Sequence, residues 1–140
     1  NNITHEILRQ LDDSFNIVVV LGGKSLHNKM IQNYAKDKNI KIVIDADNMS
    51  ELMFEADLAI GAGGSTSWER CCLGLPALLF ITAENQRVIA ENLERSGAIK
   101  IIENLQRDLQ TMINDFALWQ AMVESAQVIC DGLGVKRIKI

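Results

Sequence analysis

The 140-residue sequence has little of what marks a membrane, multi-domain or nucleic-acid-binding protein. A single proline and the lack of low-complexity tracts argue against a linker between domains. No apolar run approaches the roughly 18–20 residues that a membrane-spanning helix needs. The net charge is −4, and the lysines and arginines are scattered. Because nucleic-acid binding relies on a basic surface, we expect no nucleic acid as partner.

Cysteine is also scarce, with Cys71, Cys72 and Cys130 only. An odd count with an adjacent pair is a poor disulfide framework, and no Cys/His spacing suits zinc. We therefore expect reduced cysteines in the core or on helices of a cytoplasmic protein. The segment Asn1–Glu6 lacks the basic and apolar regions of a signal peptide. It also lacks an initiating Met, so we expect the chain to be cut from a longer one.

Short apolar runs rich in β-branched residues alternate with helical patterns. The predicted strands are Ile17–Leu21, Lys41–Ile44, Asp57–Ile60, Ala77–Ile81 and Ala98–Ile102. The predicted helices are Ser25–Asp37, Ser50–Glu55, Ser65–Leu73 and Asn85–Ser96, the last two ending at glycines. The rest of the chain has helical spacing and predicts one long helix, or two short ones broken near Asn114–Asp115.

This alternation predicts an α/β fold: a Rossmann-like, doubly wound parallel sheet of about five to six strands with a helical C-terminal tail, in a single domain over residues 1–140. Right-handed crossovers place every loop that follows a strand at one edge of such a sheet, and ligands bind there. Four loops are therefore candidates for ligand binding: Gly22–Ser25, Asp45–Asn48, Gly61–Thr66 and Thr82–Asn85.

The stretch Gly61–Glu69 carries the clearest chemical signal, because its glycines lead from a predicted strand into a helix. Glycine lets a ligand approach the backbone, and the N–H groups and dipole at a helix start favour an anion. Ser65, Thr66 and Ser67 add hydroxyl donors. The loop has neither the Walker A pattern nor Gly-x-Gly-x-x-Gly. It indicates a phosphate or diphosphate site, with a plain tight turn as the alternative.

Glu69 has two interpretations. Thr66-x-x-Glu69 is a capping box, in which the carboxylate satisfies a backbone N–H at the helix start. Alternatively, the carboxylate accepts both hydroxyls of a ribose, as acidic residues do in other α/β nucleotide folds. The histidines His5 and His27 have no carboxylate or nucleophile partner at a recognisable spacing. We predict no catalytic residue and no metal site in this chain.

The run Ala56–Pro76, followed by Glu84-Asn85-Gln86, resembles one bacterial family. It is similar to the C-terminal half of the UDP-sugar hydrolases of pseudaminic acid biosynthesis and of their spore-coat polysaccharide relatives. More distantly, it resembles the C-terminal domain of the peptidoglycan N-acetylglucosaminyltransferase that makes lipid II. There too a glycine loop, a helical Glu and Gly-Leu-Pro precede an ending like Gly97–Glu103. The resemblance covers about Ile17 to Glu103.

The resemblance implies the GT-B architecture, in which a nucleotide-sugar lies in the cleft between two Rossmann-like domains. It implies that Glu69 binds the ribose hydroxyls, and that Asn85 and Gln86 face the sugar. The positions that it implies for binding the rest of UDP are Gly22, Gly23, Lys24, Ile44, Asp45, Gly63, Gly64, Ser65 and Thr66, with the segment at Ile44 and Asp45 facing the uracil.

The family's proposed catalytic histidine lies in an N-terminal domain that nothing here matches. We therefore expect the UDP-binding C-terminal domain of a hydrolase that releases UDP from a UDP-linked 2,4-diacetamido-trideoxyhexose, inactive alone and without a cofactor. The expected partners are UDP or a UDP-sugar and the N-terminal domain of the same protein. The alternatives are the nucleotide-binding half of a GT-B glycosyltransferase and a non-catalytic subunit completed by a partner chain.

Overall fold

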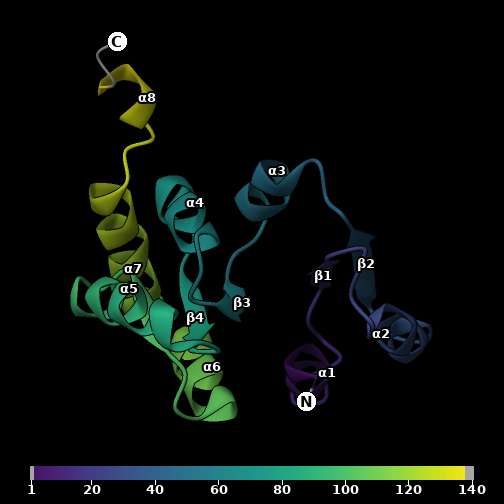
Figure 1. Cartoon of the computed structure of the whole chain (residues 1–140). Coiled ribbons are helices and arrows are strands. Elements are labelled where there is room, and N and C mark those ends of the chain that lie inside the picture. The colour runs from purple at the N-terminus through teal and green to yellow at the C-terminus, as the bar shows by residue number, and fades with distance from the viewer. Residues whose placement is uncertain (1, 138–140) are drawn as a thin grey trace. The chain divides into compact units, whose positions relative to one another are not determined.

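The computed structural model describes residues 2–137, which form eight helices and five strands (Figure 1). The described residues fall into two compact units, divided between Met49 and Ser50. Unit 1 is the part before this boundary and unit 2 the part after it. Each unit has its own parallel sheet and its own hydrophobic core.

Unit 1 pairs two strands in parallel and covers them with helices. Its elements are α1 (Ile3–Leu8), β1 (Ile17–Leu21), α2 (Asn28–Ala35) and β2 (Ile40–Ile44). The register runs from Ile17 opposite Ile40 to Leu21 opposite Ile44, so both strands end at the same edge. Leu8, Val19, Leu21 and Ile31 form the core.

The helix predicted from Ser25 begins three residues later, at Asn28. Ser25 donates its backbone N–H to the Gly22 carbonyl at 3.0 Å, and its own carbonyl accepts from the Asn28 N–H at 3.3 Å. These two hydrogen bonds fold the residues between β1 and α2 into turns, so the helix does not begin until Asn28. His27 occupies the N-cap position without a side-chain capping bond. The predicted start of this helix at Ser25 is therefore three residues too early.

Unit 2 contains the longer β–α alternation. It consists of α3 (Met49–Phe54, starting at the boundary), β3 (Ala59–Ala62), α4 (Thr66–Leu73), β4 (Ala77–Phe80), α5 (Glu84–Arg95), β5 (Ile99–Ile101), α6 (Leu105–Asn114), α7 (Phe116–Ile129) and α8 (Gly134–Arg137). Its three strands are parallel in the order β3-β4-β5. Both crossovers within this sheet run through a helix, as parallel strands require.

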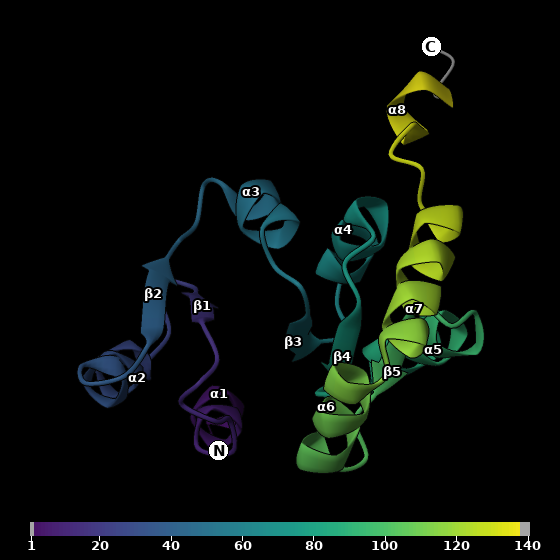
Figure 2. The same cartoon turned by 180° about the vertical axis from the view of Figure 1, so that it is seen from behind.

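The core of unit 2 lies between its sheet and the helices α4, α5 and α7. Its fully buried members come from strands and helices alike, and they are Cys71, Ala77, Leu79, Leu93, Ala98, Ile99 and Ala126. The two opposite views show α4 and α7 side by side (Figures 1 and 2). Gly74 ends α4 with φ of 67°, a left-handed conformation that glycine adopts without strain. The predicted stop after Leu73 is therefore confirmed.

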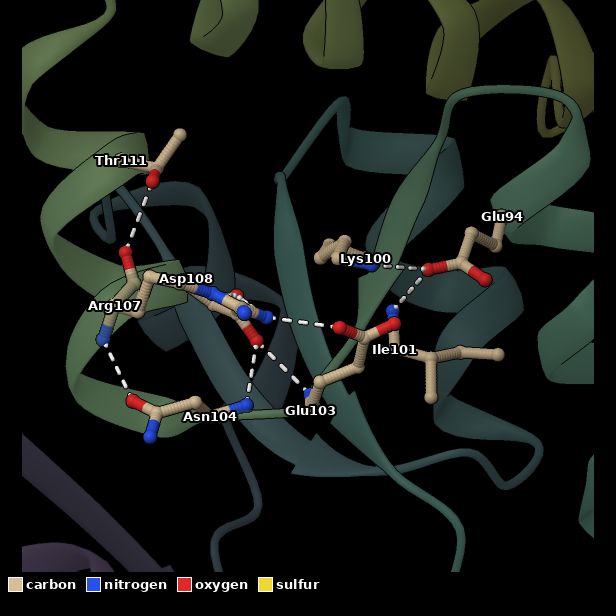
Figure 3. A network of polar contacts seen from close by, with 8 residues as sticks. All are labelled: Glu94, Lys100, Ile101, Glu103, Asn104, Arg107, Asp108 and Thr111. Carbon is tan, nitrogen blue, oxygen red and sulfur yellow. Dashed lines mark hydrogen bonds and ion pairs between the residues drawn. The ribbon is translucent and has the colours of Figure 1, made fainter.

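A polar network fixes the start of α6 (Figure 3). Asp108 is only 6% exposed, yet its Oδ2 accepts from the backbone N–H groups of Glu103 at 2.9 Å and Asn104 at 3.0 Å. Its Oδ1 accepts from the Arg107 guanidinium at 3.0 Å. Burial alone raises the pKa of the Asp108 carboxyl, but these donors outweigh it and hold the pKa below its usual value. The charge is therefore fully paired.

The predicted α/β Rossmann-like class is confirmed, with five strands in residues 2–137. They form a two-stranded and a three-stranded sheet. The third strand lies two residues later than predicted, because Gly61 and Ala62 pair with Leu79 and Phe80 and so belong to β3. The tail is indeed broken, since Asp115 caps α7 by accepting from the Leu118 N–H. No helix among residues 2–137 is long and apolar enough to cross a membrane.

Candidate functional site

The predicted site residues all follow the carboxyl ends of strands, and the structure divides them between the two units. Those of unit 1 are Gly22, Gly23, Lys24, Ile44 and Asp45. Those of unit 2 are Gly63, Gly64, Ser65, Thr66, Glu69, Asn85 and Gln86. In both sets the paired strands bring the loops together at one edge of a parallel sheet.

In unit 1 the two predicted loops are joined by a direct contact. Asp45 Oδ1 accepts a hydrogen bond from the Gly23 N–H at 2.6 Å, and the Asp45 N–H donates to the Leu21 carbonyl at 2.9 Å. Asp45 adopts a positive φ of 49°, which short polar residues tolerate. A side chain on Gly23 would place its Cβ 2.1 Å from Asp45 Oδ2. The Asp45 carboxylate thus occupies the backbone N–H of Gly23, one of the positions predicted to bind UDP.

Asn28 braces the same loop from the start of α2. Its Nδ2 donates to the carbonyls of Gly22 at 3.0 Å and Gly23 at 3.3 Å. Lys24 is exposed between these anchored residues, and a Cβ on Gly22 would have open space around it. The loop therefore presents Lys24 to solvent on a backbone that is held from two sides.

In unit 2 the glycine loop leads from β3 into α4. The Gly63 N–H donates to the Phe80 carbonyl at 3.1 Å, and the Gly64 carbonyl accepts from the Ser67 N–H at 3.0 Å. Within residues 2–137, the N–H groups of Gly64 and Ser65 make no hydrogen bond, so both are able to donate to an anion. Ser67 is fully buried, so the hydroxyl donor that we predicted there does not reach a ligand.

The structure brings Gln86 next to Gly63. A Cβ on Gly63 would lie 3.8 Å from Gln86 Cβ and 3.4 Å from Ala90 Cβ, so the loop rests closely on α5. Gln86 Oε1 accepts from the N–H and the hydroxyl of Thr82, at 3.2 and 2.9 Å. Its carbonyl end therefore holds the turn after β4. Asn85 is exposed at the start of α5.

The capping interpretation of Glu69 fails in the structure. Ser65 is the N-cap of α4 and its side chain makes no capping hydrogen bond, and within residues 2–137 the Glu69 carboxylate accepts no backbone N–H at the helix start. Instead Glu69 lines a pocket of about 390 Å³ whose walls come from α3, α4 and the end of α7. Its other lining residues are Ser50, Met53, Trp68, Cys72, Leu73 and Cys130. The surface of this pocket is almost wholly apolar, and Glu69 is the one lining residue with a carboxylate.

Arg70, the residue after Glu69, turns the other way and reaches back over β3. Its Nη1 donates to the Ala62 carbonyl at 3.4 Å, and a Cβ on Gly61 would lie 2.8 Å from its Nη2. Burial lowers the pKa of the guanidinium, against the opposing charge of Glu69. Arg70 was not among the predicted site residues, although it contacts the loop that we singled out.

The three cysteines also converge on α4. Cys71 is in the core, and burial raises the pKa of its thiol to about 11. Cys72 is exposed and hydrogen-bonded to Cys130, and both line the pocket of Glu69. All three are free, as predicted. Cys72 and Cys130, however, are neighbours of the candidate site rather than packing residues alone.

Sequence reasoning missed most of the pocket wall. Trp68, Glu69, Cys72 and Leu73 are spaced so that they share one face of α4, and this spacing was the available signal. Met53 and Cys130 carried no such signal, because their proximity depends on tertiary packing. The two histidines stay outside the site: His5 packs edge-on against Tyr34 at 5.0 Å, and His27 is exposed.

Comparison with known proteins extends this description. The model of the glycosyltransferase family 28 C-terminal domain matches residues 1–124. The spore coat polysaccharide biosynthesis protein SpsG of Bacillus subtilis is 26% identical over 132 residues, covering 88% of this chain and 39% of that protein. The UDP-N-acetylglucosamine–N-acetylmuramyl-(pentapeptide) pyrophosphoryl-undecaprenol N-acetylglucosamine transferase of Oenococcus oeni is 27% identical over 128 residues, covering 81% and 34%. An uncharacterised protein of Methanocaldococcus jannaschii is 39% identical over 94 residues, covering 62% and 19%.

Solved structures share the fold. A putative UDP-N-acetylglucosamine 2-epimerase from Listeria monocytogenes superimposes with a TM-score of 0.59 at 12% identity, covering 98% of this chain and 45% of that one. The UDP-GlcNAc 2-epimerase from Neisseria meningitidis, bound to UDP-GlcNAc, gives 0.54 at 12% identity, covering 92% and 47%. The chain thus spans less than half the length of these relatives and structures. On the match over residues 1–124, the chain belongs to the glycosyltransferase family 28 C-terminal domain family.

Proposed function

We propose that this chain binds the UDP part of a UDP-sugar and that residues 1–140 act as one nucleotide-sugar-binding domain. The observation that carries the proposal is the Glu69 carboxylate. The carboxylate does not cap α4, and Glu69 lines the 390 Å³ pocket together with Trp68. A carboxylate on an apolar wall suits a ribose, whose two neighbouring hydroxyls donate to its oxygens.

We assign the diphosphate to the glycine loop. The N–H groups of Gly64 and Ser65 are unengaged at the start of α4, where the helix dipole favours negative charge. Thr66 contributes a hydroxyl at the first position of the helix. In unit 1, Lys24 supplies a cation, and the segment at Ile44 and Asp45 is assigned to the uracil. Asn85 and Gln86 are assigned to the sugar.

For the whole protein we propose hydrolysis of a UDP-linked 2,4-diacetamido-2,4,6-trideoxyhexose in nonulosonic (pseudaminic) acid biosynthesis. Water attacks the anomeric carbon, the bond from that carbon to the diphosphate oxygen breaks, and UDP leaves. The N–H groups of the glycine loop then stabilise the charge that develops on the diphosphate. The group that activates water is proposed to lie in an N-terminal domain of the same protein. The similarity to a spore coat polysaccharide biosynthesis protein supports a place in polysaccharide biosynthesis, and the hydrolysis itself rests on the family resemblance.

The second candidate is the nucleotide-binding half of a GT-B glycosyltransferase, supported by the 27% identity to the N-acetylglucosamine transferase. Both functions use this domain in the same way, and they differ in what attacks the sugar. The full-length protein separates them. A hydrolase releases UDP and free sugar from the UDP-sugar in water alone, whereas a transferase needs an acceptor to turn over.

The binding proposal is tested by calorimetric titration of this chain with UDP and with 2′,3′-dideoxy-UDP. Glu69→Gln keeps the shape of the side chain and removes its charge, so we expect UDP affinity to fall about tenfold, the usual worth of hydrogen bonds to a charged group. The affinity for the dideoxy compound should stay unchanged, because it lacks the hydroxyls that Glu69 accepts. Glu124→Gln, on the exposed side of α7, is the matched control.

Two outcomes contradict the proposal. If the unaltered chain binds neither UDP nor UMP at millimolar concentration, it has no nucleotide site. If Glu69→Gln weakens UDP and dideoxy-UDP equally, the ribose assignment is wrong. Affinity is expected to be modest in any case, because a closed cleft is needed to bury most of a ligand.

A further inference from the structure

Arg70 occupies an unusual place for a charged residue. Its side chain leaves α4 and lies over the end of β3, where Nη1 donates to the Ala62 carbonyl at 3.4 Å. The space above Gly61 is filled by the guanidinium, since a Cβ there would lie 2.8 Å from Nη2. Arg70 is therefore held against the backbone immediately before the glycine loop.

The charge of Arg70 is not balanced by an ion pair. No carboxylate among residues 2–137 lies within salt-bridge distance of it, although other arginines of unit 2 are paired in this way. Burial of the side chain lowers the pKa of the guanidinium, and the charge of Glu69 offsets this only in part. Removing a cation from water is unfavourable unless a counter-charge compensates. A guanidinium has five N–H donors, and Arg70 uses one of them in a long hydrogen bond.

The contact with Ala62 also fixes the loop itself. The peptide group between Ala62 and Gly63 is held at both ends, because its carbonyl accepts from Arg70 and its N–H donates to the Phe80 carbonyl at 3.1 Å. The next two N–H groups, of Gly64 and Ser65, are the unengaged ones. The directions in which these two N–H groups point depend on the orientation of the preceding peptide group. Arg70 thus acts on the candidate phosphate donors through Ala62.

We propose that Arg70 is a positioning residue of the glycine loop and that its charge, which forms no ion pair within residues 2–137, makes the loop select a nucleoside diphosphate over the uncharged nucleoside. This inference rests on the proposed UDP binding and names the charge that supports it. Two effects combine: the guanidinium orients the loop through the Ala62 carbonyl, and it places a positive charge behind the N–H donors. A diphosphate bound at the loop supplies a closer counter-charge than Glu69, which makes no ion pair with Arg70 within the described chain.

The test compares uridine, UMP and UDP as ligands of the unaltered chain, Arg70→Met and Arg70→Lys, with binding followed by NMR chemical-shift titration. Arg70→Met should weaken UDP about tenfold or more, as expected for loss of a charge-assisted contact, and weaken uridine little. Arg70→Lys restores the charge without the planar fork, so its affinity for UDP should lie between the other two. Added salt should reduce the advantage of UDP over uridine less in Arg70→Met. Arg95→Met, at the exposed end of α5, is the control.

The results distinguish failure of the proposed UDP binding from failure of the role proposed for Arg70. An unaltered chain that binds no UDP contradicts the proposed function, and Arg70 then has no diphosphate to select. A chain that binds UDP, but in which Arg70→Met weakens uridine and UDP by the same factor, assigns Arg70 a purely structural role. Should Arg70→Met fail to fold, Gly61→Ala displaces the guanidinium while keeping its charge. That variant should weaken UDP several-fold and spare uridine, and unchanged UDP binding would overturn the proposal.

Discussion

The carboxylate of Asp45 accepts a hydrogen bond from the backbone N–H of Gly23, 22 residues earlier, at 2.6 Å. The two predicted nucleotide-binding loops of unit 1 are therefore tied to each other by a charged acceptor. An N–H group that binds a carboxylate at this distance is also suited to a phosphate oxygen. A diphosphate oxygen that accepts from the Gly23 N–H would have to displace the Asp45 carboxylate. The Gly23 N–H therefore cannot serve Asp45 and the ligand at the same time.

Gly23→Ala should destabilise unit 1. The new Cβ would lie 2.1 Å from Asp45 Oδ2 and push the carboxylate off the Gly23 N–H. We expect the free energy of unfolding to fall by about 1–3 kcal/mol, the usual cost of overpacking and of a lost charged hydrogen bond. Gly22→Ala, one residue away in open space, should change it by less than about 0.5 kcal/mol. Urea unfolding followed by circular dichroism measures both values.

The same substitution in an Asp45→Ala background separates the causes. Without the carboxylate, the added methyl group of Gly23→Ala meets no atom of residue 45 beyond Cβ, so most of its cost should disappear. A cost that persists in the double variant would mean that the strain lies in the backbone of the loop.

Stability at alkaline pH should depend on Cys71. This thiol is 1% exposed, and burial raises its pKa from 9.0 to about 11. Below pH 9 both folded and unfolded chains keep the proton, so the contribution is complete there. As pH rises from 9 towards 11, the unfolded chain releases the proton first, and the free energy of unfolding falls by about 2–3 kcal/mol from this group.

Urea titrations in reducing buffer at several pH values measure this effect. Cys71→Ala should be less stable at neutral pH because it leaves a cavity in the core. Its difference from the unaltered chain should shrink by about 2 kcal/mol as the pH rises through this range. A difference that stays constant would show that the Cys71 thiol ionises alike in the folded and unfolded chains.

Asp108→Asn should weaken the start of α6. The neutral amide is a poorer acceptor for the N–H groups of Glu103 and Asn104, and it loses the ionic contact with Arg107. We expect a loss of about 1–3 kcal/mol in the free energy of unfolding. Glu103→Gln alters an exposed pair with the same arginine and should cost less than about 1 kcal/mol.

The pH dependence gives a second measurement. Because the folded-state pKa of Asp108 is lowered, its contribution is present above the usual carboxyl pKa and is lost as pH falls through the lowered value. Asp108→Asn should therefore lose less stability on acidification than the unaltered chain does. Equal acid sensitivity of the two proteins would contradict the assignment.

The strands were predictable because the strands of a parallel sheet are short, nearly continuous apolar runs. Ile17–Leu21 matches β1 at both ends. The prediction failed where backbone pairing overrides composition: Gly61 and Ala62 look like loop residues, yet they pair with β4. It also failed at Ser25, whose hydrogen bonds close a turn instead of starting a helix.

The candidate site was predictable only as far as residues near in sequence define it. The glycine loop and Glu69 are contiguous, so their spacing indicated an anion site and a ribose contact. The capping box matched its pattern equally well, and only the geometry at Ser65 decided against it. The contact of Asp45 with Gly23 and the pocket wall at Cys130 join distant segments, so no local pattern indicates them.

The packing of Arg70 over Gly61 has a consequence for substitutions at position 61. The guanidinium fills the space that any side chain at position 61 would need. A residue larger than glycine at position 61 must displace the Arg70 guanidinium, which is the far end of a long, flexible side chain. The Ala62 carbonyl then loses its donor, so a substitution at position 61 alters the glycine loop through Arg70.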